Sequence, residues 1–361
     1  MKVSGNRHRN LFWMVTVIIC LGGIAPVLAE PVFAGGTGVD ISRNTRSQVW
    51  NDAGDRKVKT AIERSKTQVY WEHPFQGKFE EQLYLEQENW AFVADGKSVI
   101  DLDFQKIRPT FSMKDFGIDA KAAITVMDIH RAGGIYQPIE SDKTDSFTLP
   151  SLVGNYRNSK IIYHLGWWKE YDILPLDYLQ YTLSLSTVLL YGGGYEISKA
   201  QEASLKIQNI SRNYPSGFQL DRQDILADYS FFPPEAGSKY PAWKQVNVQW
   251  AQRHFPALDD SFQELSAENK FVFKWSGATN FVTHKLTHIS AFAVYNQGSV
   301  AEAVKEEVIP ESDLIQKIDF QAFRWIGKSP LIMAWGLTID HSLVQQAFLH
   351  WDAHLKAVYA Y

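Results

Sequence analysis

Histidine is the residue type whose spacing in this chain comes closest to a metal-binding pattern. His284 and His288 are four residues apart, and so are His350 and His354. On a helix, residues four apart have β-carbons about 5–6 Å from each other, which suits two imidazoles on one zinc or copper ion. On a strand they share a face but lie about 13 Å apart, because a strand rises about 3.3 Å per residue. The secondary structure therefore decides whether either pair can hold an ion.

The pair His350 and His354 is the stronger candidate, because the end of the chain has a helical pattern that Asp340 can cap. The apolar residues of this pattern are Leu343, Val344, Ala347, Phe348, Trp351, Leu355 and Val358. We expect an amphipathic helix here, with His350 and His354 binding zinc or copper. Packing at the margin of the apolar stripe is the competing interpretation. Neither pair encloses the glutamate that acts as general base in helical zinc proteases.

Adjacent aromatic residues suggest a binding surface. Tyr70-Trp71 and Trp167-Trp168 lie in or beside extended segments. Neighbouring strand residues point to opposite faces, so one member of each pair can be exposed. Exposed indole rings offer a large rigid contact area. Trp71, Trp167 and Trp168 are therefore candidate contacts to an envelope protein or a glycan, and burial in a core is the alternative.

Two catalytic signatures are excluded. The chain has no Gly-x-Ser-x-Gly nucleophile elbow. Gly-Lys-Ser occurs at 96–98 and at 327–329, but Ala91 and Ala322 replace the earlier glycine that a phosphate-binding loop requires. A hydrolase that uses two carboxylates in a cleft between lobes remains open, since such an enzyme needs only a suitable distance between the two groups.

The hydrophobic periodicity predicts an α+β protein with two lobes. Residues 67–212 alternate with period two and predict a β-rich N-terminal lobe, in which Asp95-Gly96 separates the strands of a hairpin. Residues 213–244, rich in proline and glycine, are expected to form a loop or linker. Residues 245–361 predict a mixed, more helical C-terminal lobe, including a helix over 313–325. Residues 30–66 are expected to form a flexible arm and a short helix.

The first 29 residues have the pattern of a cleaved signal peptide. Lys2, Arg7 and Arg9 precede an apolar run, and Val27-Leu28-Ala29 ends in a small residue. Cleavage removes Cys20, which is the single cysteine of the chain, and takes the formal net charge from −4 to −7 by removing three cations and no acid. A cysteine-free exported chain indicates the bacterial periplasm. No other stretch is long and apolar enough for a transmembrane helix.

The composition indicates a folded protein without a nucleic-acid partner. Hydrophobic residues make up 45% and aromatic residues 14% of the 361 residues, which excludes intrinsic disorder, and the charge of −4 lacks a basic surplus. Our leading hypothesis is an exported, soluble cell-envelope accessory protein that binds an envelope component or assembly partner. The alternatives are a periplasmic glycan- or peptidoglycan-active hydrolase and a histidine-based metal-binding protein.

An outer-membrane barrel is the remaining possibility, and the sequence pattern argues against it. Such a barrel needs segments of about ten residues with outward apolar alternation throughout. The last 20 residues follow a helical period instead, and residues 214–241 show no period.

Overall fold

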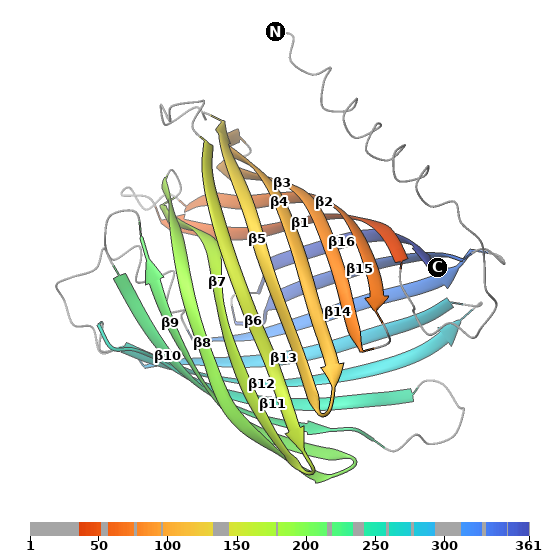
Figure 1. Cartoon of the computed structure of the whole chain (residues 1–361). Helices are drawn as coiled ribbons and strands as arrows, with labels where there is room; N and C mark the ends of the chain where they lie inside the picture. The colour runs from red at the N-terminus through yellow and green to blue at the C-terminus, as the bar shows by residue number, and fades with distance from the viewer. Residues whose placement is uncertain are drawn as a thin grey trace.

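The chain folds into one closed antiparallel β-barrel of 16 strands (Figure 1). The computed structural model describes residues 36–51, 57–75, 78–94, 97–132, 144–177, 180–214, 219–233, 242–257, 260–275, 278–292, 312–326, 330–344 and 346–360. In order, the strands are β1 (Gly36–Asn51), β2 (Lys57–Phe75), β3 (Phe79–Ala94), β4 (Lys97–Asp115), β5 (Ile118–Ala132), β6 (Thr144–Asn158), β7 (Ile161–Asp177), β8 (Gln180–Ser198), β9 (Gln201–Asn213), β10 (Gln219–Phe231), β11 (Ala242–Phe255), β12 (Asp260–Trp275), β13 (Ala278–Phe292), β14 (Asp313–Trp325), β15 (Leu331–Ser342) and β16 (Ala347–Ala360).

Pairing of the first and last strands closes the barrel. Each strand pairs with its sequence neighbour, and β1 pairs with β16 from Gly36 opposite Ala360 onward. Both of these residues therefore lie at one end of the barrel, which we name the terminus end, and the opposite end is the far end. Closure gives every strand two neighbours, so the sheet has no terminal strand with a fully unpaired edge.

Connections between strands are shorter at the terminus end. They span 76–78, 116–117, 159–160, 199–200, 232–241, 276–277 and 326–330 there, and 52–56, 95–96, 133–143, 178–179, 214–218, 256–259, 293–312 and 343–346 at the far end. Phe116 and Gly117 both have positive φ angles, of 49° and 78°, which is the conformation of a type I′ hairpin turn.

The α+β prediction is wrong, because every element of the described chain longer than a turn is a strand. The expected C-terminal helix is β16, and the expected helix over 313–325 is β14. The reason lies in geometry: Trp351 and Leu355 are four residues apart, a spacing that shares one face on a strand as well as on a helix. Ala353 and Ala357 between and beyond them point to the same side, so small outward residues concealed the period of two.

Other parts of the sequence prediction have mixed outcomes. The hairpin around residues 95–96 is confirmed, since Ala94 at the end of β3 pairs with Lys97 at the start of β4. Strand β1 and the first part of β2 lie in residues 30–66, where the sequence suggested an arm and a short helix, and β10 lies in residues 213–244, where it suggested a loop or linker. The signal peptide lies outside the described residues and stays a prediction. Within the part of the chain that is described, no helix has the length and apolar character needed to cross a membrane.

Candidate functional site: the inner wall of the barrel

The outer face of the barrel is apolar. Large hydrophobic side chains at alternate positions are exposed, and the strand register places them on one face: Trp71 pairs with Leu83, and Ile41 pairs with Leu355. We name this set the apolar belt: Ile41, Trp71, Leu83, Ile107, Phe111, Ile124, Leu152, Leu165, Trp167, Leu189, Leu205, Val248, Leu265, Leu286, Ile318, Trp335, Leu337, Trp351 and Leu355. So much contiguous exposed apolar surface is not compatible with a monomer in water.

Tyrosines mark the terminus end of the outer face. Tyr156, Tyr163, Tyr195, Tyr229 and Tyr359 are each exposed and lie within three residues of the terminus end of their strands. The rings of Tyr156 and Tyr163 stack with their centroids 6.1 Å apart. Tyrosine has an apolar ring and a polar tip, and such residues form girdles where a membrane meets water.

The inner face carries charged side chains, which form a first charged arc on β2, β3 and β4. Lys106 bonds to Glu88 at 2.5 Å and to Glu86 at 2.8 Å, and Lys66 lies 3.7 Å from Glu86. The Arg108 guanidinium lies over the ring of Tyr84, 4.6 Å from its centroid. Lys106 thus balances two carboxylates on a neighbouring strand, which fixes the arc in one arrangement.

A second charged arc lies on β9 to β12. Lys206 lies 3.0 Å from Asp228, which also accepts a hydrogen bond of 2.6 Å from Gln249. Ion pairs of 2.9 Å link Arg222 to Asp224 and Arg253 to Glu264. Strands β3 and β11 are eight positions apart in a closed ring of 16, so the two arcs face each other across the lumen. Their cations and acids are largely neutralised within each arc.

Towards the far end, the inner wall becomes apolar. The side chains there are at most 7% exposed, and Leu102 and Ile129 are 0% exposed. We name them the apolar collar: Trp90, Leu102, Phe104, Ile129, Ile210, Leu220, Phe255 and Phe262. These inward-facing side chains pack closely against their neighbours and expose little surface, so the inner wall is apolar at the level of the collar.

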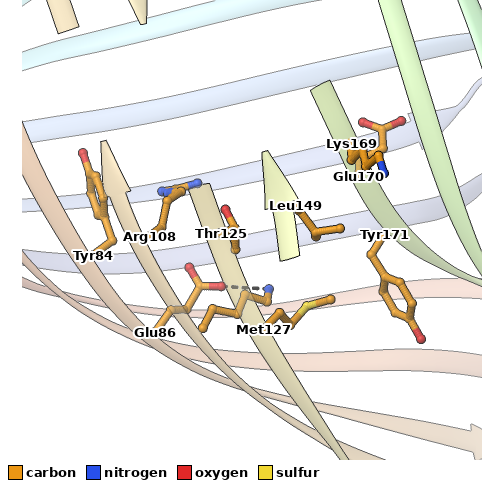
Figure 2. A pocket seen from close by; sticks show the side chains of 10 residues that line it. Tyr84, Glu86, Arg108, Thr125, Met127, Leu149, Lys169, Glu170 and Tyr171 are labelled. Carbon is orange, nitrogen blue, oxygen red and sulfur yellow. Dashed lines mark hydrogen bonds and ion pairs between the residues drawn. The ribbon is translucent and has the colours of Figure 1, made fainter. Parts of the chain in front are cut away.

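A cavity of about 210 Å³ lies beside the first charged arc, at mid-height of the wall. Its lining is formed by Tyr84, Glu86, Lys106, Arg108, Thr125, Met127, Leu149, Lys169, Glu170 and Tyr171. Figure 2 shows the residues of β3 to β6 on one side and Lys169, Glu170 and Tyr171 of β7 on the other. Trp168 donates a hydrogen bond of 3.1 Å to the Glu170 carboxylate. The cavity combines cations, carboxylates and tyrosine rings, a set that suits a polar ligand with hydroxyl or anionic groups.

Glycines make room for large inward side chains to lie along the wall. A β-carbon at Gly38 would overlap the ring of Tyr70, and one at Gly336 would overlap the imidazole of His354. Tyr70 is 2% exposed. These two rings therefore lie flat against the wall, over the glycine of the neighbouring strand.

The structure places both members of the predicted metal pair on the inner face of β16. His350 lies 3.7 Å from Asp340, and His354 lies over Gly336. A strand separates residues four apart by about 13 Å, so the helical geometry on which the metal prediction depended is absent. Across the described residues, no group of three or more His, Cys, Asp or Glu side chains is arranged to hold a metal ion.

The three predicted binding tryptophans are divided between the two faces. Trp71 and Trp167 belong to the apolar belt and are each 39% exposed. Trp168 faces inward, since its register partner Val188 is 0% exposed. The prediction that one member of an adjacent pair is exposed agrees with this arrangement, and a contact to an envelope partner stays a prediction.

Sequence reasoning missed the charged arcs altogether. A usable signal was present in β3, where Leu83 and Leu85 alternate with Tyr84, Glu86 and Glu88. This alternation places acids on one face and leucines on the other. In a soluble protein such leucines would face a core, whereas in the barrel they face outward.

No known protein-family model matches the sequence, and no curated protein matches it. Among solved structures, a bacterial polysaccharide outer membrane secretin is similar over 90% of this chain and 98% of its own, with 7% sequence identity and a TM-score of 0.51. CdiB from Acinetobacter baumannii resembles it less, with 8% identity over 90% of this chain and 60% of its own, and a TM-score of 0.47. An anion-selective porin from Comamonas acidovorans has 10% identity over 90% of this chain and 98% of its own, and a TM-score of 0.36. The first similarity shows a shared barrel fold.

The soluble accessory-protein hypothesis is contradicted by this barrel, and so are its periplasmic location and its soluble envelope partner. The apolar belt is an outward-facing surface that water does not solvate favourably. The two alternatives also fail as descriptions of the chain, because a single barrel has no cleft between lobes and no helical histidine pair. The rejection of a barrel from the sequence was wrong as well.

Proposed function

We propose that this protein is an outer-membrane channel for a hydrophilic solute, with a sugar polymer as the solute class. The observation that carries the proposal is the inverted polarity of the barrel, with the apolar belt outside and ion-paired charged arcs inside. A bilayer core requires an outward apolar band about 25 Å tall, whereas a water-filled interior requires polar side chains.

The orientation of the barrel supports this location. Both ends of the described chain and the shorter turns lie at the terminus end, together with the tyrosines. In bacterial outer-membrane barrels, short turns face the periplasm and longer loops face the outside. A predicted signal peptide before β1 supplies the export that such a protein requires.

The choice of a sugar polymer rests on the inner wall. The opposed arcs present many hydrogen-bonding groups, and their charges are paired within each arc. A wall of this kind binds hydroxyl groups without strongly selecting cations or anions. The similar secretin is described as a polysaccharide protein of the outer membrane, and this description agrees with the chemistry of the wall.

The test has two steps. Density-gradient fractionation of cells that express the tagged protein should place it with the outer membrane, and the purified protein should show discrete conductance steps in a planar bilayer. Osmotic swelling of loaded liposomes with sugars of increasing size then measures the solute class. A protein found in the soluble periplasmic fraction, or one that leaves bilayers impermeable even without its apolar collar, would contradict the proposal.

A further inference from the structure

The wall of the barrel is interrupted between β6 and β7. Their register runs from Asn158 opposite Ile161 to Ser151 opposite Trp168. No pair follows within the described residues of the two strands, although β6 extends to Thr144 and β7 to Asp177. We name these facing edges the seam. Beyond Ser151, β6 continues its pairing with β5, and beyond Trp168, β7 continues its pairing with β8.

The cavity lies in the seam itself. Lys169, Glu170 and Tyr171 are consecutive residues, yet all three line it. Alternate side chains of a strand point to opposite faces, so three consecutive residues can border one space only along the edge of their strand. On the far-end side of the cavity, the rings of Phe147 and Tyr171 approach each other across the seam, and their centroids are 4.9 Å apart. The cavity is thus a window in the wall, bounded by the last strand pair and by this ring contact.

Surface polarity locates the window near the outer border of the apolar belt. Eight strand pairs separate it from the terminus end, which corresponds to roughly 20 Å along a barrel whose strands tilt by about 40°. On β6 the outward-facing residues at this level are polar: Ser146 and Thr148 are exposed, and Ser146 donates a hydrogen bond to Asp128 of β5, although Val126 opposite Thr148 is apolar. A window with unpaired strand edges is tolerated at this level because polar groups there can satisfy the backbone, unlike in the hydrocarbon core.

Two cations in the window are available to a ligand. Within the described part of the chain, neither Arg108 nor Lys169 forms an ion pair, whereas Lys106 beside them is held by two carboxylates. Arg108 is held over the ring of Tyr84, which orients its guanidinium. Glu170, held by Trp168, adds an acceptor for hydroxyl groups. The volume of about 210 Å³ is below the roughly 300–1,000 Å³ of a site for a whole small molecule.

We infer that the window binds one anionic sugar unit, a hexose that carries a phosphate or a carboxylate. Arg108 and Lys169 bind the anionic group, and Glu170 accepts hydrogen bonds from the sugar hydroxyls. The unit reaches the window either from the membrane, as the headgroup of a glycolipid, or from the lumen, as part of a polymer. This inference rests on the proposed function for the presence of a membrane and a conducted glycan.

Calorimetric titration of the purified protein in detergent tests the inference. Glucosamine 1-phosphate and an oligosaccharide of glucuronic acid are the soluble anionic probes, glucose is the neutral probe, and lipid A in mixed micelles is the glycolipid probe. We expect anionic sugars to bind and glucose to bind at least about tenfold more weakly, because charge-assisted hydrogen bonds are roughly twice as strong as neutral ones. Binding of lipid A alone identifies the membrane as the source, and binding of the oligosaccharide identifies the polymer.

Variants separate this inference from the channel proposal. Arg108→Gln and Lys169→Gln should each weaken binding by about tenfold or more. Bilayer conductance is recorded separately for each variant and reports on the channel proposal, not on the window. Lys285→Gln is the matched control, since it alters an inward-facing lysine on β13, across the barrel, and should leave binding unchanged. Equal binding of glucose and anionic sugars, or affinities unchanged in both window variants, would overturn the inference whatever the conductance. Absence of conductance in the unmodified protein and in all three variants would instead contradict the proposed function.

Discussion

The imidazole of His354 lies directly over Gly336, its register partner on β15. A β-carbon at residue 336 would occupy the space of the ring, so the glycine and the histidine form one unit of the inner wall. This contact gives His354 a structural role that needs no metal. The same arrangement recurs with Gly38 and Tyr70, where the ring is almost fully buried.

The first prediction follows from that contact. Gly336→Ala should displace the His354 ring and lower the stability of the barrel by about 1–3 kcal/mol, the usual cost of overpacking. The temperature at which the barrel loses its faster, folded migration in gel electrophoresis measures the effect. Gly193→Ala is the control, because a β-carbon at Gly193 would meet only the Ile162 carbonyl oxygen, at 3.6 Å. Equal loss in both variants would refute the proposed role of the ring contact.

The second prediction concerns the first charged arc. Lys106→Met removes the cation shared by Glu86 and Glu88, which leaves Glu88 without its ion pair and Glu86 with only the longer contact to Lys66. We expect a loss of about 1–3 kcal/mol of stability and a shift of bilayer selectivity towards cations. Reversal potentials in a salt gradient report the selectivity. Arg43→Met breaks the exposed pair with Glu63 and should change neither property measurably; a selectivity shift in that variant would contradict the assignment of the arc to the lumen.

The third prediction tests the apolar belt. Ile124→Arg places a charge on the outer face about six residues from the terminus end of β5, where the side chain is 50% exposed. At the midplane of a bilayer, such a charge costs about 2–4 kcal/mol, and near the interface it costs about 0–1 kcal/mol. Gln105→Arg, which changes an exposed polar position on β4, should therefore be nearly neutral. Refolding yield and the denaturant midpoint of unfolding, both measured in lipid vesicles, should be lower for Ile124→Arg than for Gln105→Arg. Equal tolerance of both would argue against a membrane around the belt.

The fourth prediction addresses the apolar collar as a constriction of the lumen. Phe104 belongs to the apolar collar and is 1% exposed, so Phe104→Ala should open space at that level and increase single-channel conductance, at a stability cost of about 3–5 kcal/mol. Phe323→Ala is the control, since Phe323 faces inward near the terminus end and is already 38% exposed. Conductance that rises equally in both variants would place the constriction elsewhere.

Parts of the fold were predictable from local pattern. The hairpin of β3 and β4 follows from an Asp-Gly pair between two alternating segments, and the strands over much of residues 67–212 follow from their period of two. These features depend on a few neighbouring residues, so no distant contact is needed to recognise them. The acidic face of β3 was visible in the same way, but not the side of the sheet on which it lies.

The main error of the sequence prediction, a soluble protein in place of a barrel, comes from the apolar surroundings of the outer face. Alternation of apolar and polar residues on a strand does not say which face is inside the molecule. In a soluble protein, Leu83 and Trp71 would pack in a core, whereas here they face outward and the polar residues Glu86 and Lys106 face inward. The helical interpretation of β16 had a similar cause, because its large outward residues, Trp351 and Leu355, are separated by alanine.

The sequence by itself determined the strand period, the turn chemistry and the leader pattern, all of which act over a few residues. Only the tertiary structure decided that β1 pairs with β16, that the two charged arcs face each other, and that β6 and β7 part at Ser151 and Trp168. The physical reason is closure. A ring of 16 strands joins residues more than 300 positions apart, and it alone defines an inside for Lys106 and an outside for Ile107.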